Sequence, residues 1–485
     1  MAALWFIAVL GAVGAAALIV WLQAHDYFND ALSLLACVVP LVALFAVSGR
    51  IASFRWTPTF GMLAAVCFFL FFTAGLVQYW INGRSIGFAI AGPVDSALVR
   101  DTLISCSIVT CMLILGDRLG RGRQHIEQEP MPNVSTPILM LSQVLWALAV
   151  YGCLDVARSL GGIAAAAARL SLHDRNVSIE TSGTLGMSLW ATFALPSIVT
   201  LFLVALGNNR SKRLRVFAAG QALIVVGFGM TMFGSRLLLV LSVVALAFSY
   251  FKVRGRTPSF KSAVAVVLLI LATSALVLGG RAEALKTTHD ASILDTIGYS
   301  IFDVSVASQG SVDELRPVLG SIERGLTVLS AALPGSGARA ADISQARIDV
   351  LVVQAIGSMA QANNSGLPPS LPTSLVLGFA LPIGMFLALI VGTLLGLVTN
   401  WLSRLRKPLG VVLFGLWGAF LFNTFKGGDL LLDIGSEARR WVYILVIYLA
   451  IVAFTQRKEL GSLETQKYRV HHSRISGSYP DVRGK

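Results

Sequence analysis

The chain has 485 residues, of which 55% are hydrophobic and only 13% are charged, whereas about 25% of the residues in an ordinary soluble domain are charged. The mean hydropathy is +0.75. These values exclude a soluble globular protein and a disordered one. They predict an all-α, polytopic integral membrane protein, because apolar runs long enough to cross a bilayer recur from end to end.

Taken in chain order, the apolar runs predict about twelve membrane spans. We place them at 3–22, 31–48, 57–80, 101–116, 137–154, 186–206, 216–233, 237–252, 262–278, 373–400, 409–425 and 438–454. No basic residue precedes the first run, and Asp26 and Asp30 follow it. We therefore expect a retained helix there, not a cleaved signal peptide.

Lysines and arginines gather in alternate loops, which predicts that both termini are cytoplasmic. The formal net charge of +13 is then mainly an orientation signal and not a nucleic-acid footprint. Two long loops, at about 155–185 and 279–372, are expected on the outer face. The predicted division is 1–278 (spans one to nine), 279–372 (a large outer loop), 373–454 (spans ten to twelve) and 455–485 (a basic cytoplasmic tail).

The large loop has the composition of helices. Val318, Ile322, Leu326 and Leu329 recur at helical spacing after Pro317, which is a favourable residue at the first position of a helix. Together with the apolar stretch 348–359, this predicts two or three helices that lie on the membrane surface or tuck back into it. We expect the loop to form part of a site, the alternative being a lid over the bundle.

The outer loops are rich in arginine and poor in lysine. A guanidinium group binds phosphate oxygens with two parallel hydrogen bonds and is weakly hydrated, so we expect these arginines to bind an anionic lipid head group such as a diphosphate. Ion pairs with neighbouring carboxylates are the alternative. The candidates are Arg158, Arg169, Arg175, Arg281, Arg316, Arg324, Arg339 and Arg347.

Arg236 follows Gly234 and Ser235, which resemble a helix end and an N-cap. It would begin a short membrane helix, where free backbone N–H groups, the helix dipole and the guanidinium together make an anion site. Snorkelling of the side chain to the head groups is the alternative.

Two further segments carry polar residues into the predicted spans. The stretch 363–370, which includes Asn364, leads into a span that Pro382 interrupts; it lines a polar cavity or is an ordinary kinked helix. Lys426-Gly427-Gly428-Asp429 precedes the last span, with Arg439 and Arg440 shortly after it. These charges bind substrate or merely end a helix.

The candidates for a general base are Asp155, His173, Asp174, His289, Asp290, Asp303 and Glu323, and their spacing singles out none of them. We choose Asp303 because it lies in the apolar stretch Ile297–Ala307, where burial would raise its pKa. The five cysteines all lie in apolar runs, so neither a disulfide framework nor a metal site is expected.

Gly116–Arg123 is similar to the D-R-x-G-R loop of major facilitator transporters, but it follows the fourth span instead of the second. We interpret it as a basic cytoplasmic loop.

Three segments resemble the Wzy-type O-antigen and exopolysaccharide polymerases: Phe233-Gly234-Ser235-Arg236-Leu237, Gly366-Leu367-Pro368-Pro369-Ser370 and Lys426-Gly427-Gly428-Asp429. The number of spans and the single dominant outer loop are also similar. Arginine–glycine pairs with ten residues between them, as in this family's outer loops, occur at Arg175…Gly186 and Arg324…Gly335.

The resemblance implies a metal-independent membrane glycosyltransferase of the bacterial inner membrane that needs no cofactor. It would transfer a glycan from its polyprenyl diphosphate to the sugar of a second lipid-linked repeat unit on the periplasmic face. Arginines, Arg236 and Arg324 among them, would neutralise the diphosphate leaving group. The implied partners are polyprenyl-diphosphate-linked oligosaccharides, membrane lipids and a Wzz-like chain-length regulator.

Two alternatives remain. O-antigen ligases, which transfer the glycan to lipid A-core, share the architecture, but they usually carry a histidine shortly before span ten, where this chain has Gln361, Asn363 and Asn364. A transporter or flippase of lipid-linked glycans would need a charged lumen, and the cores of these spans hold almost no charge.

Overall fold

The computed structural model describes residues 28–48, 58–86, 93–122, 134–166, 185–207, 211–231, 236–254, 301–330, 346–356, 369–405 and 407–476. Within these ranges every extended regular element is a helix, and the only bridge is an isolated one between Ser85 and Pro93. The prediction of an all-α chain is confirmed for this part of the protein.

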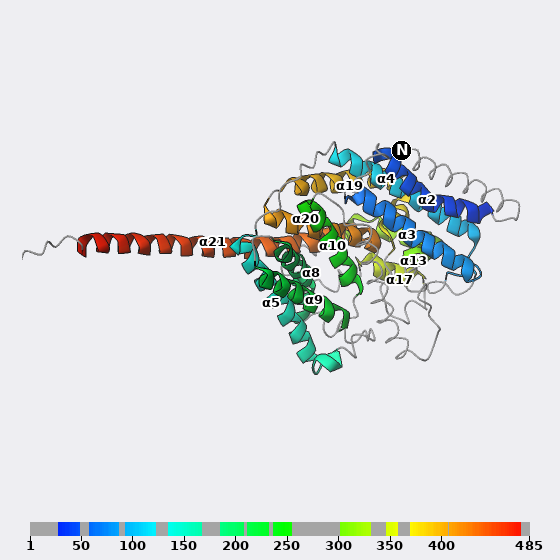
Figure 1. The fold of residues 1–485 in the computed structure, drawn as a ribbon. Helices are drawn as coiled ribbons and strands as arrows, with labels where there is room; N and C mark the ends of the chain where they lie inside the picture. Colours follow the sequence, from blue (N-terminus) through cyan, green and yellow to red (C-terminus); the bar gives the residue numbers. More distant parts are fainter. Residues whose placement is uncertain are drawn as a thin grey trace, which may run out of the picture.

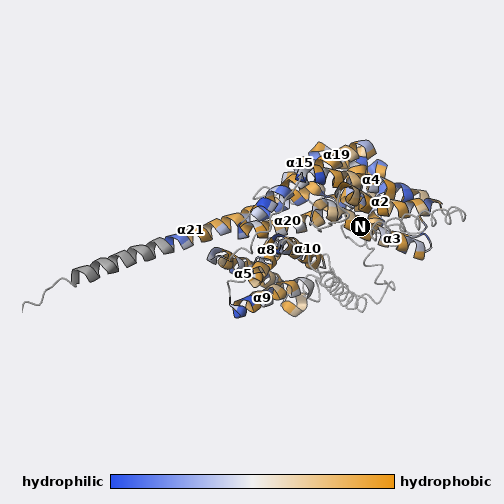
Figure 2. Cartoon of the chain, turned by 45° about the horizontal axis from the view of Figure 1, so that its top comes forward, coloured by the Kyte–Doolittle hydropathy of each residue, from blue (hydrophilic) through white to orange (hydrophobic). Residues whose placement is uncertain are grey.

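Nine of the described helices are long and apolar enough to cross a membrane. They are α2 (Phe28–Ser48), α3 (Phe60–Ile81), α4 (Ser96–Arg121), α5 (Thr136–Ser159), α8 (Leu185–Leu206), α10 (Arg236–Arg254), α19 (Leu371–Arg404), α20 (Pro408–Gly427) and α21 (Leu430–Ser476). Hydrophobic residues cover much of these helices (Figure 2). Each overlaps a predicted span, so the protein is a helical membrane protein.

Three predicted spans stand apart from these nine. The spans at 3–22 and 262–278 lie outside the described residues. Helix α9 (Lys212–Thr231) overlaps the predicted span 216–233, but it is not among the nine. Its first turn carries Lys212, Arg213 and Arg215, which leaves a shorter apolar stretch.

The closest helix pair joins α4 to α19, which stand far apart in the sequence. A Cβ atom at Gly116 would lie 2.3 Å from the carbonyl oxygen of Leu389, and one at Gly120 would lie 2.1 Å from that of Thr393. On the partner helix, Gly392 and Gly396 face the backbone of α4 equally closely. Small residues four apart on both helices allow this backbone approach, which stabilises helix pairs in lipid.

Ion pairs lie at both ends of the bundle. At one end, which we call the loop end, Arg84 forms an ion pair with Asp30 at 2.9 Å. At the other, basic end, the carboxylate of Asp117 is fully buried and accepts hydrogen bonds from Gly61 N (3.1 Å) and Arg121 Nε (3.0 Å). Asp117 belongs to the segment that is similar to the transporter loop, and here it fastens α3 to α4.

Helix α19 is broken near its start, as Pro382 predicts. Ala380 has φ 60° and ψ 164°, a backbone conformation that is costly for any residue other than glycine. A Cβ at Gly384 would lie 2.8 Å from the carbonyl oxygen of Leu375, although nine residues of continuous helix would span about 13 Å. The first part of α19 (371–379) therefore folds back onto the second (381–404).

The large loop contributes four described helices: α13 (Ile301–Gly310), α14 (Val312–Leu319), α15 (Ile322–Leu329) and α17 (Ile348–Ile356). Helices α13, α14 and α17 share a small apolar core with Leu377 of α19; this core contains Val304, Leu315, Leu319, Ile348, Val352 and Val353. The prediction that Pro317 begins a helix is wrong. Pro317 lies inside α14, and the next helix begins after Ser321, whose hydroxyl caps it.

The last helix is longer than predicted. Helix α21 begins at Leu430, eight residues before the predicted span 438–454, and it continues to Ser476. Figure 1 shows it projecting from the body of the molecule. The predicted cytoplasmic tail was to begin at residue 455, but the helix continues through this position without a break.

The glycine contact between α4 and α19 yields a prediction with a matched control. Gly116→Ala should destabilise the protein by about 1–3 kcal/mol, the usual cost of overpacking, because the added methyl meets the backbone of α19. Gly220 on α9 has open space around it, so Gly220→Ala should be neutral or stabilising by up to about 1 kcal/mol. Thermal unfolding in detergent measures both, and equal effects of the two variants would contradict the contact.

Candidate functional site

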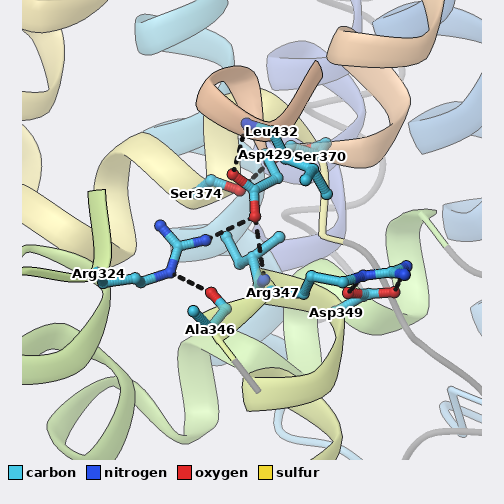
Figure 3. Close-up of polar contacts among 9 residues, drawn as sticks. Arg324, Ala346, Arg347, Asp349, Ser370, Ser374, Asp429 and Leu432 are labelled. Carbon is cyan, nitrogen blue, oxygen red and sulfur yellow. Dashed lines mark hydrogen bonds and ion pairs between the residues drawn. The ribbon is translucent and has the colours of Figure 1, made fainter. Parts of the chain in front are cut away.

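Asp429 lies between two membrane-spanning helices, after α20 and directly before α21. Its side chain is only 7% exposed. One carboxylate oxygen, Oδ2, accepts hydrogen bonds from Arg324 Nη2 at 2.7 Å and from the backbone N of Ile348 at 3.2 Å (Figure 3). Asp429 therefore links α15 and α17 of the large loop to the end of the bundle.

Arg324 is positioned by the first turn of α15. The hydroxyl of Ser321 accepts a hydrogen bond from Arg324 N at 3.2 Å, and Arg324 Nε donates to the carbonyl of Ala346 at 2.8 Å. The Arg324 side chain is 11% exposed, so its pair with Asp429 is almost fully buried. Its third nitrogen, Nη1, has no hydrogen bond with a described residue and remains able to donate.

Arg347 and Asp349 form a second ion pair beside the first (Figure 3). Nε and Nη2 of Arg347 donate to the two oxygens of Asp349 at 3.0 and 2.6 Å, and the Arg347 side chain is 45% exposed. Burial alone would lower the pKa of Arg347. The hydrogen bond and charge of Asp349, together with the charges of Asp429 and Asp433, outweigh burial and raise that pKa. Arg347 is thus a permanent cation at the surface of the cluster.

The Lys426–Asp429 segment contacts the Gly366–Ser370 segment, two of the three on which the resemblance rests. Gly428 has φ +65°, and a Cβ there would lie 2.3 Å from the carbonyl of Pro369 and 2.4 Å from the hydroxyl of Ser374. Only glycine fits this left-handed turn and this close approach. Of the third segment, Phe233–Leu237, the structure describes only Arg236 and Leu237, which begin α10. The side chain of Arg236 is not described.

The first part of α19 is also tied to the large loop. Arg316 of α14 donates from Nε to the carbonyl of Leu377 at 3.3 Å. Deeper in the protein, Thr373 donates to Ser305 of α13 at 2.7 Å. The broken helix, the loop helices and the Asp429 turn are therefore connected to one another. We call the residues at their meeting point the Asp429 cluster: Arg324, Arg347, Asp349, Asp429 and the start of α19.

Further polar groups follow α21 inward from the cluster. Asn423 of α20 donates to Asp433 at 2.8 Å. One turn further along, Glu437 is 6% exposed, pairs with Arg440 and accepts from Trp441 Nε1 at 2.8 Å. Arg440 also donates to the carbonyl of Ala191 on α8 at 3.3 Å. Arg440 therefore joins helices and does not belong to the Asp429 cluster.

The remaining predicted site residues divide into four groups. Lys426 and Arg439 are partly buried and make no hydrogen bond or ion pair with a described residue, whereas Arg158 is exposed at the end of α5. Asp303 is 6% exposed on α13, as its apolar surroundings predict. Outside the described residues lie Arg169, Arg175, Arg281, Arg339 and Asn364.

The predicted site residues did not include Asp349, and Asp429 entered only as part of the charged segment Lys426–Asp429 before the last span. Asp429 stands in a Gly-Gly-Asp turn between two apolar spans, which is a visible signal for a polar group at a membrane boundary. No group of three or more His, Cys, Asp or Glu residues within the described ranges is arranged to hold a metal ion.

Comparison with known proteins found no match to a family model, a curated protein or a solved structure.

The buried pair yields a stability prediction. Asp429→Ala leaves Arg324 charged and unpaired, so it should cost about 3–5 kcal/mol. Arg324→Ala leaves the buried carboxylate of Asp429 without its cationic partner and should be similarly destabilising. The double variant removes both charges and should cost clearly less than the sum of the two single variants. Unfolding of the purified protein in detergent measures the cycle, and strictly additive effects would show that the two groups do not interact.

Proposed function

We propose that this protein is a membrane glycosyltransferase that polymerises polyprenyl-diphosphate-linked oligosaccharide repeat units. In this proposal the loop end faces the periplasm of a bacterial inner membrane. The growing glycan passes from its lipid diphosphate to a hydroxyl of the incoming lipid-linked unit. The supporting observation is the Asp429 cluster, because it gathers two arginines of the large loop at the loop end of two membrane-spanning helices.

The chemistry needs little beyond charge and position. As the bond between the sugar C1 and the diphosphate oxygen breaks, the electron pair and a negative charge remain on the leaving diphosphate. Nη1 of Arg324 and the exposed guanidinium of Arg347 are the donors that we assign to this charge. Lys426, which has no acidic partner among the described residues, would attract the same anion.

A base must take the proton of the attacking hydroxyl. We retain Asp303 for this role, because α13 is fastened to the start of α19, which itself contacts the Asp429 turn. The buried carboxylate would accept the proton as the hydroxyl oxygen bonds to C1. Asp303→Asn keeps the shape and removes the base, so it should abolish transfer without preventing the protein from folding.

The decisive test is deletion of the gene in its host, followed by electrophoresis of the surface polysaccharide. A polymerase predicts core lipid that carries a single repeat unit and no ladder. Loss of all repeat units from the core, with accumulation of lipid-linked polymer, would indicate a ligase. Lipid-linked single units retained on the cytoplasmic side would indicate a flippase, and an unchanged ladder in a host without a second polymerase would overturn the proposal.

Complementation with a matched pair of variants tests the role of the cluster. Arg324→Lys keeps the positive charge and loses the guanidinium fork, so activity should fall about 100-fold or more and the ladder should disappear. Arg84→Lys makes the same change in an ion pair at the same end of the bundle, away from the cluster, and should restore the ladder. Membrane levels of both variants are compared by immunoblot, and a full ladder with Arg324→Lys would exclude Arg324 from catalysis.

A further inference from the structure

Helix α15 exposes a stripe of large apolar side chains. Ile322 is 80% exposed, Leu326 65% and Leu329 40%. These positions are spaced by four and three residues, so they lie on one face of the helix. The opposite face holds Arg324, bound to Asp429, and Val328, which is fully buried. The helix is therefore fixed to the protein by one face while an apolar face points away from it.

The other helices of the large loop do not share this property. Helices α13, α14 and α17 contribute apolar residues to the common core that includes Leu315 and Val352, and among the large apolar side chains described in them only Val318 is exposed. Glu323 and Thr327 lie on the remaining side of α15, where Glu323 is exposed. Helix α15 therefore has three separate faces: one buried, one polar and one apolar and exposed. An exposed contiguous apolar stripe of this kind marks an interaction surface.

The position of the stripe identifies what covers it. Gly325 lies between the buried face and the stripe, and a Cβ there would lie 3.3 Å from a methyl group of Leu431. Leu431 is in the first turn of α21, inside the stretch Leu430–Arg457 that is apolar enough to cross a membrane. One turn further, Ile434 is 39% exposed, and Val442 and Val446 beyond it are 55% and 60% exposed. The stripe therefore lies beside the exposed apolar residues of α21.

We propose that α15 is an interfacial helix whose Ile322, Leu326 and Leu329 side chains insert among the acyl chains of the outer leaflet. Its polar side then faces the head groups and water, as in amphipathic helices that lie in the plane of a membrane. Two turns, about 12 Å long, are too short to bind a bilayer alone, but α15 is held against α21 through Arg324 and Gly325. The inference rests on exposure and position and does not depend on the proposed enzymatic activity.

The experiment places the photoreactive residue p-benzoylphenylalanine at single positions of the full-length protein, reconstituted in nanodiscs of phosphatidylethanolamine and phosphatidylglycerol. Position 326 tests the stripe, position 446 on the exposed face of α21 is the lipid-facing control, and position 323 on the polar side of α15 is the matched control. After irradiation, intact-protein mass spectrometry measures the fraction of chains that carry one phospholipid. We expect adducts at 326 comparable to those at 446, and few at 323.

Three results would overturn the proposal. Adducts at 326 as scarce as those at 323 would mean that the stripe faces water. A cross-linked dimer in place of lipid adducts would mean that a second copy of the chain covers it. The same label irradiated in native membranes could instead join position 326 to another protein and leave lipid adducts absent, which would make the stripe a surface for that protein.

A second measurement is independent of photochemistry. Leu326→Asp brings a charge to the inserted face, so it should lower the midpoint of thermal unfolding in nanodiscs, whereas Thr327→Asp on the polar side should leave it unchanged. If the midpoint is the same for both variants, the stripe is not in contact with acyl chains. Position 326 is exposed, and Thr327 is bonded to the carbonyl of Glu323 in its own helix, so neither variant disturbs the core.

Discussion

Four glycines hold α4 against α19, and the rest of the structure depends on that contact. A Cβ at Gly116, Gly120, Gly392 or Gly396 would lie 2.1–2.5 Å from the backbone of the facing helix. Hydrocarbon gives two apolar helices no hydrophobic reason to associate, so the gain must come from dispersion between closely approaching backbones. Beside this contact, the buried Asp117 binds α3 and Arg121, which fixes the same helix end from the other side.

The position of α19 in turn determines the position of the candidate site. Its long second part is held by α4, so the chain before Pro382 must reverse direction, and Ala380 takes a strained conformation to do so. The reversed first part, 371–379, brings Pro369 and Ser374 against Gly428. That contact sets the turn in which Asp429 reaches Arg324. The strain at Ala380 is thus balanced by contacts that assemble the Asp429 cluster.

The sequence predicts the parts of this structure that follow from composition, and misses those that follow from tertiary contacts. Apolar runs locate the nine described membrane helices, and Pro382 locates the break in α19. Pro317 misleads because the acidic residues Asp313 and Glu314 favour an earlier helix start, and Ser321 caps the next helix. The end of α21 is missed because a helix can continue past its apolar stretch into charged sequence.

For the candidate site, the type of residue in the loops indicated which side chains could bind an anion, but the sequence did not indicate which of them lie together in space. The preference for loop arginines over lysines selected Arg324 and Arg347, which the structure places in one cluster. The same argument selected Arg158, which it places elsewhere. The partner of Arg324 is 105 residues away in the chain, and no local pattern joins the two. Glycines four apart in α4 and again in α19 were a readable signal for close helix packing that the span prediction did not use.

The charge balance of the Asp429 cluster favours one way of using its arginines. Arg324 and Arg347 each already have a carboxylate partner, so an intact diphosphate would compete with Asp429 and Asp349 for the same donors. Under the proposed function, binding of the lipid-linked substrate would therefore gain little from these residues. The charge that grows on the diphosphate oxygen as its bond to the sugar breaks would gain more. The bonds of Arg324 Nε to Ala346 and of Nη2 to Asp429 already hold the guanidinium group, and with it Nη1, in place. Donors that favour the breaking bond over the intact one accelerate the reaction without holding the substrate too tightly.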